Sequence, residues 1–255
     1  MSQKFKLGLI IVFLLIIIVE GIMLYPKIKN YFYREKIDKI NNSTILEIKE
    51  ENIVTEKTEH EIEPDKETPK KAYLKVPFIT QAPLETEANW KLHEESCEEA
   101  ALLQAYLYET GQTITRPQAN EKILDMIDWQ KKNLGSHHDL YAEEIKKFIM
   151  GYYNLQDPEI KIIFDASIDD IKKQIASGHP VIVPIMGDIL KNPYYPYPGY
   201  HMLTAVGYTE DRIITNDNGT KRGADFTYDI EIFKTAMDAA DGDILILNLK
   251  GPNKN

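Results

Sequence analysis

Cysteine is almost absent from this chain: Cys97 is the single one among 255 residues. No disulfide can form within the chain, which excludes a small scaffold held together by disulfides. A cysteine-ligated zinc or iron–sulfur site is excluded as well, because such a site needs several thiolates. Any chemistry that involves Cys97 therefore uses this thiol alone or together with other residue types.

The chain also lacks an excess of basic residues. Its 30 Lys and Arg residues face 40 Asp and Glu residues, for a net charge of -10. Binding to nucleic acid depends on Lys and Arg that neutralise phosphates, so we expect no nucleic-acid partner. The 43% hydrophobic content is typical of a globular protein large enough to bury a core.

A long apolar run stands near the N-terminus, in a segment (residues 1–42) with a net charge of +4. Residues 7–19 contain no charge, and the run extended to Tyr25 would measure about 28 Å as a helix, close to the ~30 Å of a hydrocarbon core. We expect a single transmembrane helix over about residues 7–25. A cleavable signal peptide is the alternative, although no small-x-small cleavage site follows the run. Basic residues flank both ends, so charge does not assign the orientation.

Residues 43–72 have a different composition. They carry a net charge of -4, contain no aromatic residue and show no sustained hydrophobic period. We expect a flexible, charged linker here, followed by one domain over residues 73–255.

The domain is predicted to belong to the α+β class, because its helices come mainly first and its strands mainly later. Gly111 is expected to end the first helix, and Ser167 with Asp170 to cap the fourth. The expected helices cover residues 96–108, 120–128, 141–150, 167–176 and 229–237, and the expected strands cover 74–79, 181–185, 201–208, 212–217 and 244–249.

Cys97 is expected to be the first residue of its helix. Ser96 and Glu99 have the spacing of a capping box, with Ser96 as the N-cap. The positive end of a helix dipole favours an anion, which lowers the pKa of a thiol there. The carboxylates of Glu98 and Glu99 act in the opposite direction, so a nearby base would be needed to activate the thiol. The alternative is that Cys97 is only a small buried apolar residue.

Most of the six histidines are poor candidates for that base. His60 lies in the linker, and nothing beside His93 would fix its ring. His137 and His138 have no third ligand at a suitable spacing, so we expect no metal site. His179 follows a helix and is expected to cap its C-terminus.

His201 is the exception, because it opens a strand of a predicted hairpin. If Thr209–Asp211 form a three-residue turn, Asp217 lies on the same sheet face as His201, at ~7–8 Å on the diagonal. A two-residue turn would bring Asn218 to that face instead. Either side chain could accept the ring N–H and orient the histidine.

Four ordered motifs resemble the bacteriocin-processing, or double-glycine leader, type of papain-like cysteine peptidase, and in particular its stand-alone branch at bacterial cell surfaces. They are Val-Pro-Phe-Ile-Thr-Gln81, Ser-Cys97-Glu-Glu-Ala-Ala, Gly-His-Pro-Val-Ile-Val-Pro, and Tyr-His201-Met-Leu-Thr-Ala-Val-Gly-Tyr with Ile-Thr-Asn-Asp217. The resemblance implies a papain-like fold, with Cys97 as nucleophile and His201 as general base. It further implies that Asp217 orients His201 and that Gln81 donates an N–H to the oxyanion. Glu98 and Asn218 stand where the family often has glycine and proline.

These features predict a membrane-anchored cysteine peptidase that acts on a peptide or another amide through an acyl-enzyme, without metal, cofactor or nucleotide. The resemblance places its domain outside the bacterial membrane. The tyrosine- and proline-rich segment 191–200 is expected to contribute to substrate specificity. Transfer of the acyl group to an amine is an alternative, and so is a binding module without turnover.

Overall fold

The computed structural model describes residues 3–51, 53, 68–195 and 199–249, and the side chains of residues 3–18 lie outside that description. Two compact units, residues 1–43 and 44–255, make up the chain. Helix α1 (Gln3–Glu50) begins in the first unit and ends in the second. Within the described part of the chain, no helix combines the length and apolarity that a membrane crossing requires. The predicted span, residues 7–25, falls partly on side chains that are not described.

The expected linker is shorter than predicted, because α1 continues to Glu50. The last turns of this helix bury Ile48, which packs with Val206 and Ile214 of the second unit. Lys71 Nζ donates to Glu51 Oε1 at 2.7 Å and also bonds Glu47. Tertiary packing therefore stabilises a helix in residues 43–50, where the sequence pattern was too short to show a period. Residues 52 and 54–67 of the expected linker lie outside the described residues.

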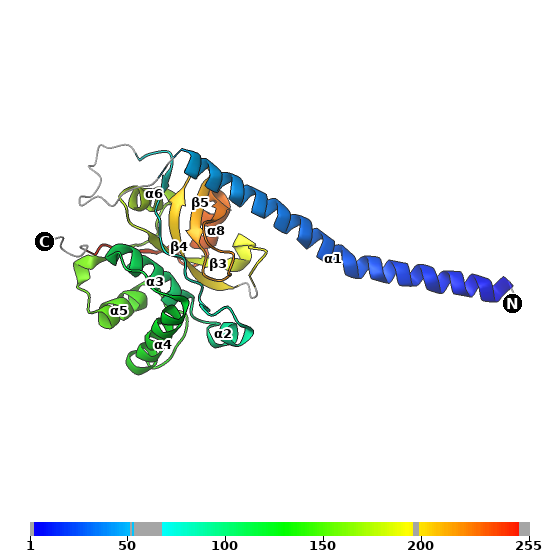
Figure 1. Ribbon diagram of the computed structural model, residues 1–255, viewed down its shortest axis with the longest axis horizontal. Coiled ribbons are helices and arrows are strands. Elements are labelled where there is room, and N and C mark those ends of the chain that lie inside the picture. The colour runs from blue at the N-terminus through cyan, green and yellow to red at the C-terminus, as the bar shows by residue number, and fades with distance from the viewer. Residues whose placement is uncertain (1–2, 52, 54–67, 196–198, 250–255) are drawn as a thin grey trace. The chain divides into compact units, whose positions relative to one another are not determined.

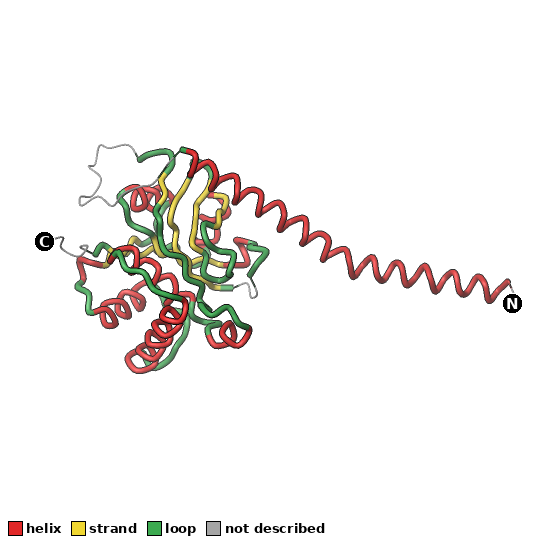
Figure 2. The backbone as a smooth tube through the Cα atoms, in the orientation of Figure 1, coloured by secondary structure: helices red, strands yellow, loops and turns green. Residues whose placement is uncertain are grey.

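The second unit is built around an antiparallel sheet of seven strands (Figures 1 and 2). Six strands follow the order β2-β7-β3-β4-β5-β6, and β1 pairs with β4. The α+β prediction with an antiparallel sheet is confirmed. The strands are β1 (Ala72–Tyr73), β2 (Ile160–Ile163), β3 (Val181–Met186), β4 (Tyr200–Tyr208), β5 (Arg212–Asn216), β6 (Phe226–Asp229) and β7 (Ile244–Leu247).

Helix α3 is largely buried in this unit. Helix α3 packs into the core with its Leu102 against sheet residues such as Ile182, Met202 and Leu245. Figures 1 and 2 show α3, α4 and α5 grouped together beside the strands. The helices are α2 (Glu87–Leu92), α3 (Cys97–Thr110), α4 (Arg116–Asn133), α5 (Ala142–Tyr153), α6 (Ile168–Ala176), α7 (Gly187–Leu190) and α8 (Ile230–Asp238), with a 3-10 turn at Asp157–Glu159.

Several expected elements are confirmed and several are corrected. Ser167 and Asp170 form the predicted capping box of α6, and Gly111 ends α3 in the left-handed conformation with φ 66°. The expected edge strand 74–79 is wrong, because the strand β1 stops at Tyr73. The sequence did not predict the short elements α2, α7, β2 and β6, each of four to six residues, although it did predict strands of that length at β5 and β7.

The β4–β5 hairpin has the predicted strand pairing near Asp217, but its turn differs from the prediction and a β-bulge compensates for the difference. Next to the turn, Tyr208 pairs with Ile213 rather than with Arg212. A β-bulge between Ala205 and Gly207 then shifts the register by one residue, so that Thr204 pairs with Asn216. Because side chains alternate along a strand, this bulge returns Asp217 to the sheet face that carries His201.

Candidate active site

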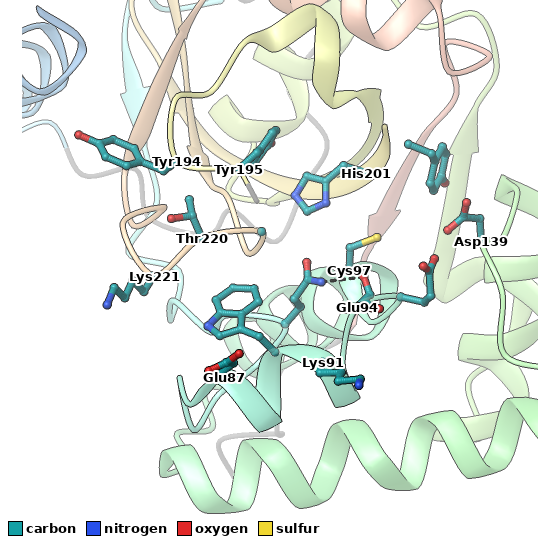
Figure 3. A pocket seen from close by; sticks show the side chains of 15 residues that line it. Glu87, Lys91, Glu94, Cys97, Asp139, Tyr194, Tyr195, His201, Thr220 and Lys221 are labelled. Carbon is teal, nitrogen blue, oxygen red and sulfur yellow. Dashed lines mark hydrogen bonds between the residues drawn. The ribbon is translucent and has the colours of Figure 1, made fainter. Parts of the chain in front are cut away.

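Cys97 and His201 line the same cavity, whose volume is about 570 Å³. Figure 3 shows both side chains on its wall, with Tyr194, Tyr195 and Asp139 around them. Cys97 comes from the first residue of α3 and His201 from β4, two elements that pack directly on each other. The cavity is also lined by Gln81, Glu87, Trp90, Lys91, Glu94, Glu95, Tyr200, Gly219, Thr220 and Lys221.

Cys97 begins helix α3 as predicted, but the predicted capping box is absent. Ser96 makes no side-chain cap bond. Its hydroxyl lies 3.2 Å from His93 Nδ1, while the carboxylate of Glu99 is bonded by Gln130 and lies 3.1 Å from His137 Nε2. Contacts with neighbouring buried side chains therefore replace the local cap.

The thiol of Cys97 is buried and faces a carboxylate. Cys97 Sγ donates to Glu98 Oε2 at 3.1 Å, and Leu140 N donates to Glu98 Oε1 at 3.0 Å. Burial, and then the charge and hydrogen bond of Glu98, raise the pKa of the Cys97 thiol well above its ordinary value. The expected lowering by the helix dipole is thus outweighed in this arrangement.

The carboxyl of Glu98 is itself perturbed. It is 1% exposed, and burial together with the charge of Glu99 raises its pKa to about 8. Of the two buried carboxyl groups at the start of α3, that of Glu98 contacts the thiol, and the nearby charge of Glu99 opposes its ionisation.

His201 and Asp217 form a direct contact. His201 Nε2 lies 3.1 Å from Asp217 Oδ1, and Asp217 is fully buried. Among the described residues, His201 Nδ1 has no hydrogen-bond partner. Gly219 borders this pair, and a Cβ on Gly219 would stand 3.0 Å from His201 Nε2.

Asp217 is surrounded by donors that the sequence analysis missed. Its Oδ2 accepts hydrogen bonds from Asn192 Nδ2, Tyr195 Oη and Tyr228 Oη. Burial raises the pKa of Asp217, but the bond and charge of His201 and the bonds of the two tyrosines hold it below its ordinary value. Asn192 and Tyr195 stand in the tyrosine-rich segment 191–200, for which the sequence predicts a contribution to specificity, whereas no pattern in the sequence points to Tyr228.

Asn218, the alternative to Asp217, lies elsewhere. Its Nδ2 donates to Cys97 O at 3.0 Å and to Met202 O at 2.9 Å. It is fully buried and makes no contact with the ring of His201 in the described hydrogen bonds. Asn218 thus ties the start of α3 to β4, next to both Cys97 and His201.

Gln81 lies beside Cys97 in the cavity, but both of its N–H groups are used. Gln81 Nε2 donates to His93 O at 2.8 Å and to Glu94 O at 2.9 Å. Its backbone N–H donates to Asn218 O. In this state Gln81 shapes the loop before α3 and has no free donor for an oxyanion.

Four of the other histidines have structural contacts, and His60 lies outside the described residues. His93 is fully buried and its Nε2 contacts Asn120 Oδ1 at 3.0 Å. His179 does not cap a helix with its side chain as expected, because its Nδ1 lies 2.9 Å from Glu109 Oε1. His137 and His138 diverge towards different carboxylates, Glu99 and Glu144.

The segment 191–200 contributes to the site in several ways. Tyr195 contacts Asp217 and lies with its ring edge-on to His201, with centroids 5.2 Å apart. Tyr194 and Tyr200 line the cavity, and Tyr200 Oη donates to Leu140 O. Residues 196–198 lie outside the described residues.

Comparison with known proteins adds family evidence to this geometry. In fold, the chain is similar to the crystal structure of a Bacillus anthracis protein described as a C39-like peptidase, with a TM-score of 0.52 at 15% identity, over 72% of this chain and 100% of that one. No curated protein matches the chain. Residues 73–240 match the Peptidase_C39 like family, which confirms the resemblance, and the chain belongs to that family.

Proposed function

We propose that this protein is a cysteine peptidase that cleaves a peptide or another amide through an acyl-enzyme on Cys97. The observation that carries this proposal is the 3.1 Å contact of His201 Nε2 with the buried Asp217, because His201 lines the same cavity as Cys97. With a proton on Nε2, the other ring nitrogen is left as a base that faces no described partner. This is the tautomer that a general base needs.

In the proposed reaction, His201 Nδ1 takes the proton of Cys97 Sγ. The thiolate then attacks the carbonyl carbon, and the imidazolium gives its proton to the leaving amine as the C–N bond breaks. Water, with His201 as base, hydrolyses the thioester and releases the carboxylic acid. An amine in place of water would give acyl transfer instead.

Two rearrangements belong to this proposal. The thiol must turn from Glu98 towards His201 before it can lose its proton to the imidazole. Gln81 must release one of the carbonyls of His93 and Glu94 to donate to an oxyanion beside the backbone N–H of Cys97. Active-site hydrogen bonds often change on substrate binding, so the unbound arrangement does not argue against these roles.

A binding module without turnover is the second candidate. It is favoured by the hydrogen bond from Cys97 to Glu98, which keeps the thiol protonated. Such a module would bind peptides in the same cavity and would not need a thiolate.

The pH dependence of alkylation separates the two candidates, and the single cysteine makes the reaction specific to Cys97. If the protein is a peptidase, Cys97 should be alkylated readily in the wild type. At the same pH it should be alkylated more slowly in His201→Ala, because a smaller fraction of the thiol is ionised. Identical profiles for both proteins would overturn the peptidase proposal. Retained peptide binding in Cys97→Ala, with no cleavage by the wild type, would support the binding module.

We also propose, from the sequence alone, that residues 7–25 anchor the domain in a bacterial membrane with the cavity outside. The uncharged run of residues 7–19 supports this proposal. The full chain should stay in the membrane fraction after a high-salt wash, and protease added to intact spheroplasts should degrade the domain. Release of the chain by salt would contradict the anchor, and protection from protease would contradict the orientation.

A further inference from the structure

Asp217 has an unusual number of hydrogen-bond donors for one buried carboxylate. Oδ2 accepts from Asn192 Nδ2 at 3.0 Å, from Tyr195 Oη at 2.8 Å and from Tyr228 Oη. Oδ1 accepts from Gly219 N at 3.2 Å and contacts His201 Nε2 at 3.1 Å. Five donors thus divide between the two oxygens, and only Oδ1 faces the histidine.

The three side chains on Oδ2 come from two separate parts of the chain. Asn192 and Tyr195 belong to the segment between α7 and β4, and Tyr228 belongs to β6. Asn192 Nδ2 also donates to Tyr228 Oη at 2.7 Å. Because this tyrosine accepts from Asn192, its own proton is directed to Asp217. The three side chains therefore form one connected hydrogen-bond network on Asp217 Oδ2, the carboxylate oxygen that does not contact His201.

The physical need for such a network follows from the burial of Asp217. A carboxylate with 0% exposure is unstable as an anion unless hydrogen bonds replace its lost water. A protonated Asp217 could donate to His201 instead of accepting from it, and the ring would then lose the Nε2–H tautomer. Tyr195 restrains the ring in addition, because it packs edge-on against His201.

We propose that Tyr195, Tyr228 and Asn192 are positioning residues that keep Asp217 ionised, with Oδ1 directed at His201. This inference rests on the proposed function, since it assigns these residues to the general base of that reaction. It gives the tyrosine-rich segment before His201 a role in setting the proton position on the base, in addition to lining the cavity.

The test uses the full-length chain labelled with ¹⁵N-histidine, in the wild type and in Tyr228→Phe and Tyr195→Phe. The pH titration of the His201 ring signals, assigned with His201→Gln, reports the low-pH inflection at which Asp217 takes a proton. Loss of one donor is expected to raise this inflection by about one pH unit, and loss of both hydroxyls by more. Tyr208→Phe is the matched control, because Tyr208 is buried and donates to Pro69 O at 2.8 Å, away from Asp217.

If the low-pH inflection of His201 lay at the same pH in Tyr228→Phe, Tyr195→Phe and the control Tyr208→Phe, the inference would be overturned. Tyr195→Phe decides the question by itself if Tyr228→Phe does not fold. Where a peptide substrate is cleaved, the acid limb of kcat/KM should move to higher pH in the same variants and not in the control. A shifted inflection in a chain that cleaves nothing would leave this inference standing and count against the peptidase proposal.

Discussion

The thiol of Cys97 donates its hydrogen bond to Glu98, the next residue in the chain, at a distance of 3.1 Å. Both side chains are almost fully buried, and Glu98 is held from its other oxygen by Leu140 N. Above its pKa of about 8, the ionised Glu98 stabilises the thiol form, because an adjacent thiolate would be a second negative charge in a buried site. Glu98 thus opposes the activation that His201 would provide.

Replacement of Glu98 by glutamine is expected to make Cys97 more reactive. The amide oxygen can still accept a hydrogen bond from the thiol, but the negative charge is gone, so the pKa of Cys97 should fall by about one unit or more. Iodoacetamide alkylation as a function of pH measures this change directly. Glu121→Gln, on the exposed surface of α4, is the matched control. An unchanged or higher midpoint in Glu98→Gln would contradict the inhibitory role of Glu98.

The stability of the domain should depend on pH through Glu98. Its pKa is raised to about 8 in the folded protein, mainly by burial, whereas an unfolded glutamate titrates near ~4.3. Between these values the folded state binds the extra proton, so the free energy of unfolding falls as pH rises, by up to about 1.4 kcal/mol per pH unit from this group.

Urea unfolding at a series of pH values from 5 to 9, compared between wild type and Glu98→Gln, checks this dependence. The wild type should lose stability relative to the variant as pH rises, and the difference should become constant above the pKa of Glu98. A difference that is the same at all these pH values would show that Glu98 does not carry the dependence.

The sequence predicted those parts of the site that depend on local pattern. The capping-box spacing of Ser96 and Glu99 predicted Cys97 as the first residue of its helix, which is confirmed although Ser96 makes no side-chain cap bond. The contact of His201 with Asp217 follows from strand alternation once the register is known. The observed register agrees with the predicted one only because two unpredicted features cancel: the turn is longer than expected, and a bulge near Val206 shifts the pairing back by one residue. A bulge leaves no clear mark in a single sequence, so this agreement was partly fortuitous.

The remaining features depend on contacts between distant segments. Glu99 has the spacing of a capping residue, but it is buried against Gln130, 31 positions away. Tyr228 reaches Asp217 from a strand that the pattern did not predict. Side-chain networks of this kind are set by the packing of the sheet on α3, which periodicity alone does not specify.

Gly219 is expected to be required for the geometry of His201. A Cβ at this position would stand 2.9 Å from His201 Cε1, closer than real Cβ atoms approach a neighbour, and 3.1 Å from Tyr195 Cε1, which is tighter than most Cβ contacts. Gly219→Ala should displace the imidazole, and a displacement of about 1 Å can lower kcat/KM by ~10²-fold. Gly199→Ala is the control, because a Cβ there meets no atom of the described residues within 4 Å. Equal activity of the two variants, measured on the same peptide, would contradict the steric argument.

Asn218 is expected to contribute to stability and to the site together, because it joins the two elements that carry Cys97 and His201. Asn218→Ala removes both hydrogen bonds to the carbonyls of Cys97 and Met202 and leaves these buried acceptors without that donor. The expected loss in the free energy of unfolding is about 2–3 kcal/mol, and the reactivity of Cys97 should lose much of its dependence on His201.

Asn216→Ala provides the comparison that separates these two effects. Asn216 is also a buried asparagine, but its Nδ2 donates to Val76 O, and it therefore lies outside the Cys97–His201 connection. In urea unfolding, we expect Asn216→Ala to lose about as much stability as Asn218→Ala. Adding His201→Ala to Asn216→Ala should change the alkylation of Cys97 as much as it does in the wild type. If Asn216→Ala and Asn218→Ala reduced that change equally, the effect would come from general loosening of the domain, and Asn218 would have no particular role in aligning α3 with β4.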